Sequence, residues 1–106
     1  MINIIYDSMN YKVTIEGHAG YAEHGKDIVC AGVSTLAYTL SSYLQKMNNE
    51  QKLIYFYATM KDGQSEIECF PKQNFIDEVL LVYDVVINSL KHLAKSYPAN
   101  ISINEI

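Results

Sequence analysis

The chain carries no charged residue between Asp27 and Lys46. Apolar residues recur there at helical spacing, which predicts a helix over residues 28–46 with one side in a core. This apolar stripe consists of Val29, Val33, Leu36, Ala37, Leu40 and Leu44. Small polar residues interrupt the apolar ones, so the stretch is a poor candidate for a membrane span. Because the opposite side is also uncharged, we expect a second covering surface there, such as a subunit interface.

Alternating apolar residues at the N-terminus predict a β-hairpin. Its strands cover residues 2–6 and 11–15, and residues 7–10 form its turn. All the apolar positions then share one face, and matching them across the turn defines the register. The expected pairs are Ile4 with Val13 and Ile2 with Ile15.

A second hairpin is expected around an Asp-Gly turn at residues 61–64, because strand formers dominate residues 53–60 and alternation follows the turn. A two-residue loop sets Ala58 opposite Ile67 and Phe56 opposite Cys69. Cys69 is therefore predicted to be a buried structural residue.

The C-terminal part is predicted to hold a helix with Asn74 as its N-cap, followed after Pro98 by a short strand over residues 101–104. Asp77 and Glu78 lie in the first turn of this helix, where negative charge is favourable. The resulting order ββαββαβ predicts one two-layer α+β domain over residues 1–106. Its helices pack on one face of a mainly antiparallel sheet.

The formal net charge is −4, with only eight Lys plus Arg. Direct nucleic-acid binding and binding to anionic membranes both need clustered positive charge, so neither is expected. The two cysteines do not make a disulfide framework, and no signal peptide precedes the N-terminal strand. We therefore expect a cytoplasmic protein with free thiols.

Residues 17–26 form a glycine-containing loop that leads into the predicted helix. Asp27 is a strong N-cap residue, which makes Cys30 the third residue of the helix. A helix N-terminus and a nearby imidazolium both favour a thiolate, although the Asp27 carboxylate opposes it. His18 ends a predicted strand, so the loop can fold back and bring it to Cys30 as a catalytic dyad. Ser34 lies one turn further along and should face the same way.

The glycines of this loop suggest that it moves. Gly17, Gly20 and Gly25 bracket small or polar residues, so we predict a mobile gate that orders when an extended substrate lies against the site. Backbone N–H groups at the start of the following helix are natural donors to an oxyanion.

Several other interpretations stay open on the residues alone. A free cysteine is often inert packing, and an exposed loop histidine such as His24 often has no role. A zinc site of His18, His24 and Cys30 would lack a fourth ligand and the usual short-spaced pairs. A redox sensor would need a resolving cysteine near Cys30. A non-enzymatic interaction module, binding a partner through the uncharged helix and the tyrosine-rich strands, is a further alternative.

The segment Gly-His-Ala around His18, followed by Gly-x-Asp-Ile-Val-Cys-Ala-Gly-Val-Ser at residues 25–34, closely resembles the bacterial ribosomal-processing cysteine protease family Prp. The resemblance implies Cys30 as nucleophile and His18 as base, while Asp27 and Ser34 match motif positions beside them.

The same resemblance implies a function. Proteases of this family look like homodimers, without metal or cofactor, that act during ribosome assembly. They remove a short N-terminal extension from the large-subunit ribosomal protein numbered twenty-seven. The cut follows an aromatic pair, which implies an apolar pocket. The alternative is a non-enzymatic, ribosome-associated protein-interaction module.

Overall fold

A computed structural model describes residues 1–106 and contains the predicted order ββαββαβ. The elements are β1 (Ile2–Asp7), β2 (Lys12–Glu16), α1 (Ile28–Asn49), β3 (Leu53–Lys61), β4 (Gln64–Pro71), α2 (Ile76–Ser96) and β5 (Ile101–Glu105). Two short 3₁₀ turns, Ser8–Asn10 and Gln73–Phe75, precede β2 and α2. The α+β class predicted from the sequence is confirmed.

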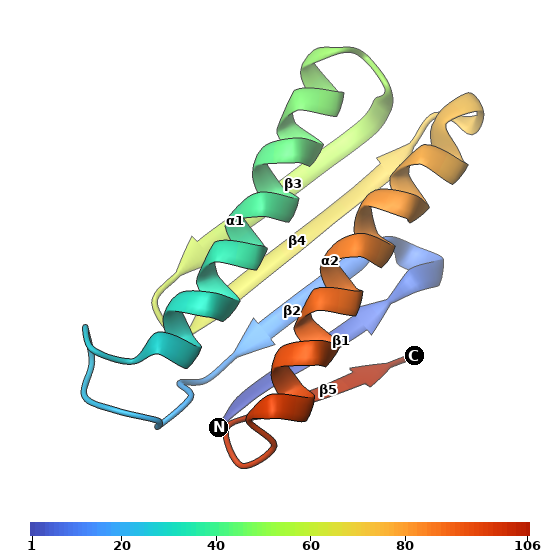
Figure 1. Ribbon diagram of the computed structural model, residues 1–106. Coiled ribbons are helices and arrows are strands. Elements are labelled where there is room, and N and C mark those ends of the chain that lie inside the picture. The colour runs from blue at the N-terminus through green and yellow to red at the C-terminus, as the bar shows by residue number, and fades with distance from the viewer.

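The five strands form one sheet in the order β3-β4-β2-β1-β5. Three neighbouring pairs are antiparallel, and only β1 and β5 run parallel. Both helices cover the same face of the sheet and run in opposite directions (Figure 1), with α1 over β3 and β4 and α2 over the half that holds β5. Neither helix combines the length and the hydropathy that a membrane span requires.

The core lies between the helices and the inner face of the sheet. Five of the six predicted stripe residues of α1 are buried, Leu36 is half-buried, and Met47 extends the stripe by one turn. Full burial of a Leu or Val side chain stabilises a fold by about 1.5 to 3 kcal/mol, so this stripe attaches α1 firmly to the sheet. The strands contribute Ile2, Ile4, Tyr6, Val13, Ile15, Leu53, Ile67, Cys69 and Ile101.

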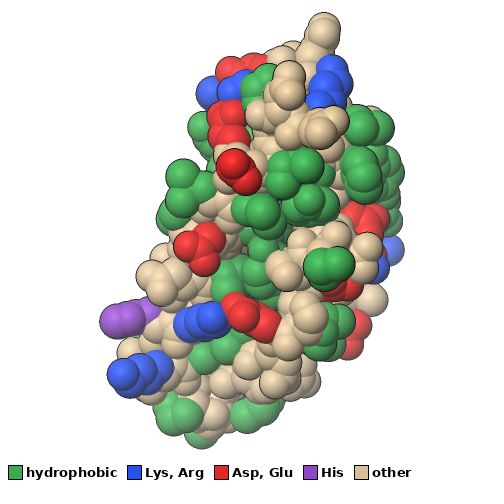
Figure 2. Space-filling model, turned by 90° about the vertical axis from the view of Figure 1, so that its right-hand side faces the viewer, with side chains coloured by type: hydrophobic (Ala, Val, Ile, Leu, Met, Phe, Trp, Pro, Cys, Tyr) green, Lys and Arg blue, Asp and Glu red, His purple; other side chains and the backbone are tan.

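Charged side chains of both signs are interspersed on the face seen in Figure 2. Several charged side chains of the protein form ion pairs, such as Lys91 with Glu105 at 2.6 Å and Lys12 with Glu66 at 2.7 Å. Exposed pairs of this kind contribute about 0 to 1 kcal/mol each, so they do little for the fold.

The register predicted for the first hairpin is wrong by two residues. Ile4 pairs with Ile15 and Tyr6 with Val13. The cause is the loop: Ser8–Asn10 form a 3₁₀ turn, and Tyr11 adopts a left-handed conformation with φ 51°, so Tyr11 belongs to the turn. A shift of two leaves the same side chains facing the core, because strand side chains alternate with period two.

The second hairpin has the predicted register, with Ala58 opposite Ile67 and Phe56 opposite Cys69. By contrast, Asn74 is not the cap of α2. It lies inside the 3₁₀ turn, and α2 begins at Ile76 without a side-chain cap. Asp77 and Glu78 do occupy the first turn, as predicted.

Candidate active site

Cys30 lies in the first turn of α1, where the sequence predicted it. Asp27 is the N-cap, and its Oδ1 atom accepts hydrogen bonds from the N–H groups of Val29 at 3.0 Å and of Cys30 at 2.9 Å. The half-buried sulfur therefore lies at the positive end of the helix dipole.

The second carboxylate oxygen of Asp27 binds the preceding loop. It accepts hydrogen bonds from the N–H groups of Tyr21 at 2.9 Å and of Ala22 at 3.3 Å. The Asp27 side chain is buried, and these backbone donors, that of Cys30 first, hold the pKa of Asp27 below its ordinary value of 3.8. One charged carboxylate thus joins the start of α1 to the loop.

This arrangement changes one expectation about the oxyanion. The N–H groups of Val29 and Cys30 already donate to Asp27, so these two amides are not free to bind an oxyanion. The prediction that the start of the helix supplies such donors is wrong for this pair, because the cap uses them.

The loop folds back over α1 at Ala19. The Ala19 N–H donates to Cys30 Sγ at 3.3 Å, and its carbonyl oxygen accepts from Asn100 Nδ2 at 2.9 Å. Asn100 was not predicted, because it lies 81 residues from Ala19 and belongs to no motif.

His18, next to Ala19, lies against the β3–β4 turn. A Cβ atom added to Gly63 would lie 2.8 Å from His18 Nε2, and Gly63 has φ +75°. The Gly17 N–H also donates to the Gly63 carbonyl oxygen at 2.9 Å. Gly63 therefore lets the imidazole approach the backbone, a role that the sequence suggested only as a turn glycine.

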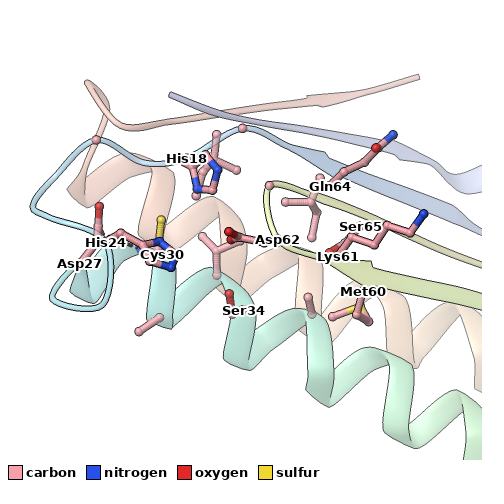
Figure 3. Close-up of a pocket in the computed structure, with 18 of the residues that line it drawn as sticks. His18, His24, Asp27, Cys30, Ser34, Met60, Lys61, Asp62, Gln64 and Ser65 are labelled. Carbon is pink, nitrogen blue, oxygen red and sulfur yellow. Dashed lines mark hydrogen bonds between the residues drawn. The ribbon is translucent and has the colours of Figure 1, made fainter.

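A cleft of about 670 Å³ opens at this end of α1 and contains the predicted site residues. Figure 3 shows Cys30 and Ser34 on α1, His18 on the loop above them, and Asp62 on the β3–β4 turn. The volume of the cleft is typical of ligand sites, which span roughly 300 to 1,000 Å³. The apolar part of the lining comes from Ile2, Ile15, Val33, Ala37, Tyr38 and Met60, among others.

The loop of Gly17, Gly20 and Gly25 has all three glycines at positive φ. Besides its hydrogen bonds to Asp27, Cys30 and Asn100, it packs the Tyr21 ring edge-on against Tyr97 at 5.5 Å between centroids. Its opening during substrate binding stays a prediction.

The remaining cysteine and the two remaining histidines lie in different environments. Cys69 is buried as predicted, and burial raises its pKa to about 11. Both cysteines are free. His92 is exposed on α2. His24 lines the cleft, and its ring centroid lies 6.3 Å from that of His18. The Asp62 carboxylate lies close to both histidines.

A thiol at a helix N-terminus, sharing a cleft with an imidazole, is the arrangement of thiol hydrolases. The sequence model of the family described as cysteine protease Prp matches residues 1–102. The chain therefore belongs to the Prp family of cysteine proteases.

Known relatives agree with this assignment. The chain is 34% identical over 101 residues to the ribosomal processing cysteine protease Prp of Mycoplasma genitalium, covering 92% of this chain and 90% of that protein. Identity to Prp of Staphylococcus aureus is 29% over 92 residues, covering 87% and 83%. These matches favour a protease over a redox sensor or an interaction module.

Solved structures share the fold. A crystal structure of S. aureus Prp with a covalently linked product peptide matches with a TM-score of 0.81 and 25% identity, over 100% of both chains. A second S. aureus Prp structure, with a substrate peptide, matches with a TM-score of 0.69 and 23% identity, over 99% and 97%.

The two thiols should differ strongly in reactivity. Near neutral pH, iodoacetamide should alkylate Cys30 roughly a hundredfold or more faster than Cys69, because the thiolate is the nucleophile and Cys69 is buried with a raised pKa. His18→Ala should slow labelling of Cys30. Peptide mass mapping over time measures both sites, and the Cys30→Ala variant reports Cys69 alone. Equal labelling in the folded protein would contradict the difference.

Asp27 should make stability depend on pH. Its pKa is lowered on folding, so the charged carboxylate stabilises the fold above its ordinary value of 3.8, and this stabilisation disappears as the pH falls through the folded value. Asp27→Asn should therefore unfold at lower urea concentration at neutral pH, with a gap that narrows below pH 3.8.

The exposed carboxylate of Asp84 on α2 provides the matched control for this measurement. Asp84→Asn should change stability at neutral pH by less than about 0.5 kcal/mol. A deficit in Asp27→Asn that stays constant down to acid pH would show that charge is not the cause.

Proposed function

We propose that this protease removes the short N-terminal extension of the large-subunit ribosomal protein numbered twenty-seven during ribosome assembly in the cytoplasm, with a Cys30–His18 dyad. The observation that carries the proposal is the folding of the loop onto α1, which places both residues in one cleft and an N–H donor on the sulfur. The names of the relatives from M. genitalium and S. aureus, both ribosomal processing proteases, support the substrate class.

In this mechanism His18 takes the proton of the Cys30 thiol, and the thiolate attacks the carbonyl carbon of the scissile peptide. The C–N bond then breaks, and the proton passes from His18 to the leaving amine. His18 then takes a proton from water, which attacks the thioester carbonyl carbon. The C–S bond breaks, the extension leaves as a carboxylic acid, and the proton on His18 returns to the Cys30 sulfur. Asp27 supports the reaction by directing the first turn of α1, and Ser34 lies beside the nucleophile on the cleft wall.

The apolar lining of the cleft supports an extended peptide with aromatic residues before the cut. Val33, Tyr38 and Met60 add apolar surface beside Cys30 and Ser34. Aromatic side chains bury large apolar areas and gain specificity from such pockets.

We also propose that the enzyme is a homodimer that uses the outer side of α1. This side keeps Ile28, Tyr38 and Tyr43 exposed by 60%, 58% and 39%, and it carries no charge before Lys46. An uncharged helix face of this kind is typical of a buried interface. Because Tyr38 also lines the cleft, the second copy would lie beside the substrate.

Light scattering tests the dimer. The protein should have twice the chain mass of 12.0 kDa, and Tyr43→Glu should shift it to one chain by placing a charge in the interface. Tyr57→Glu, on an exposed tyrosine of β3, is the matched control and should leave the dimer intact. A single-chain mass for the unmodified protein at micromolar concentration would contradict the proposal.

Cleavage itself is tested by incubating the reduced protein with the extended ribosomal protein and measuring intact mass. One cut should release the extension, and Cys30→Ala and His18→Ala should each reduce the rate to background. Failure of fresh, reduced protein to cut this substrate would contradict the assigned substrate.

Gly63→Ala sharpens the same experiment. The added Cβ would meet His18 Nε2 at 2.8 Å, so we expect a folded variant whose imidazole is displaced and whose cleavage rate falls roughly a hundredfold. Gly25→Ala is the matched control, since Gly25 also has positive φ but no atom within 4 Å of an added Cβ. Similar losses in both variants would attribute the effect to backbone strain.

A further inference from the structure

Three side chains that could bind a metal ion gather at the mouth of the cleft. Only one of them, His18, has a role in the mechanism above. His18, His24 and Asp62 each place one possible ligand atom within 4.8 Å of the others. All three are exposed, and they come from the start of the loop, the end of the loop and the β3–β4 turn. Figure 3 shows the three side chains in the cleft that Cys30 also lines.

Two imidazoles and one carboxylate are a ligand set suited to Zn²⁺. Zinc bonds these atoms at about 2.0 to 2.2 Å, which places tetrahedral ligands roughly 3.5 Å apart. The three groups would therefore need to approach one another by about 1 Å. Exposed side chains on a loop and a turn can do this by small rotations. Water would take the fourth position, as in open zinc sites.

We propose that His18, His24 and Asp62 form an inhibitory site for a zinc-class divalent cation. The site rests on the proposed function, because its effect depends on His18 acting as the base. A neutral imidazole has a single free lone pair, and a metal ion that occupies it leaves no acceptor for the thiol proton. The ion would also tie the loop to the β3–β4 turn across the mouth of the cleft.

This site differs from direct capture of the thiol. Cys30 Sγ accepts a hydrogen bond from the Ala19 N–H inside the cleft, whereas the three proposed ligands are exposed at its mouth. A cation held by Cys30 and His18 would need neither His24 nor Asp62. The dependence of binding on these two residues therefore separates the modes.

Binding is measured first, on the Cys30→Ala protein, which has no thiol in the cleft. Zn²⁺ titrated against a chromophoric chelator should bind one ion per chain. His24→Ala and Asp62→Asn should each weaken binding roughly tenfold or more. His92→Ala, which removes an exposed histidine from α2, should leave the affinity unchanged.

Unchanged affinity in His24→Ala or Asp62→Asn would overturn the site. This measurement needs no cleavage, so a wrong substrate assignment would leave its result intact.

Inhibition is measured next, with each variant compared to its own rate without metal. Zn²⁺ should block cleavage by the protein with Cys30 present, and a chelator should restore it. The Zn²⁺ concentration for half inhibition should rise roughly tenfold or more in His24→Ala and Asp62→Asn, but not in His92→Ala. Equal inhibition in all variants, or a thiolate-to-cobalt charge-transfer band on adding Co²⁺, would assign the ion to Cys30 and overturn the proposal.

Discussion

The buried carboxylate of Asp27 is the interaction on which the site depends. One of its oxygens accepts the N–H groups of Val29 and Cys30, and the other accepts those of Tyr21 and Ala22. A buried charge is costly unless hydrogen bonds satisfy it, and four backbone donors do so here. The start of α1 and the loop are therefore held as one unit, which places the sulfur and its surroundings together.

The rest of the site is assembled from segments that are far apart in the chain. Asn100, just before β5, holds the carbonyl of Ala19, while Gly63 at the β3–β4 turn lies against His18. These two contacts come from opposite ends of the strand order, because β3 and β5 are the edge strands of the sheet. The loop over Cys30 is thus held by contacts near both edges of the sheet. Its geometry therefore depends on the whole fold.

Predictions from local pattern succeeded where the deciding interactions are local. The cap at Asp27, the apolar stripe of α1 and the Asp-Gly hairpin each depend on residues within a few positions of one another. They failed where a neighbouring element decides. Val82 on α2 is half-buried against the core, and no local pattern singled out the fully buried residue beside it, Tyr83. Its hydroxyl donates to the carbonyl of Tyr11, and its ring stacks on Tyr6 at 5.6 Å.

The sequence by itself determined the element order, the α+β class and the placement of Cys30 in the first turn of a capped helix. These follow from periodicity and from capping chemistry, which act within one or two turns. Only the tertiary structure decided the close approach of Gly63 to His18, the hydrogen bond from Asn100, and the grouping of Asp62 with His18 and His24. Each of these joins residues distant in the chain, and such contacts depend on how the sheet aligns its strands, which no local pattern specifies.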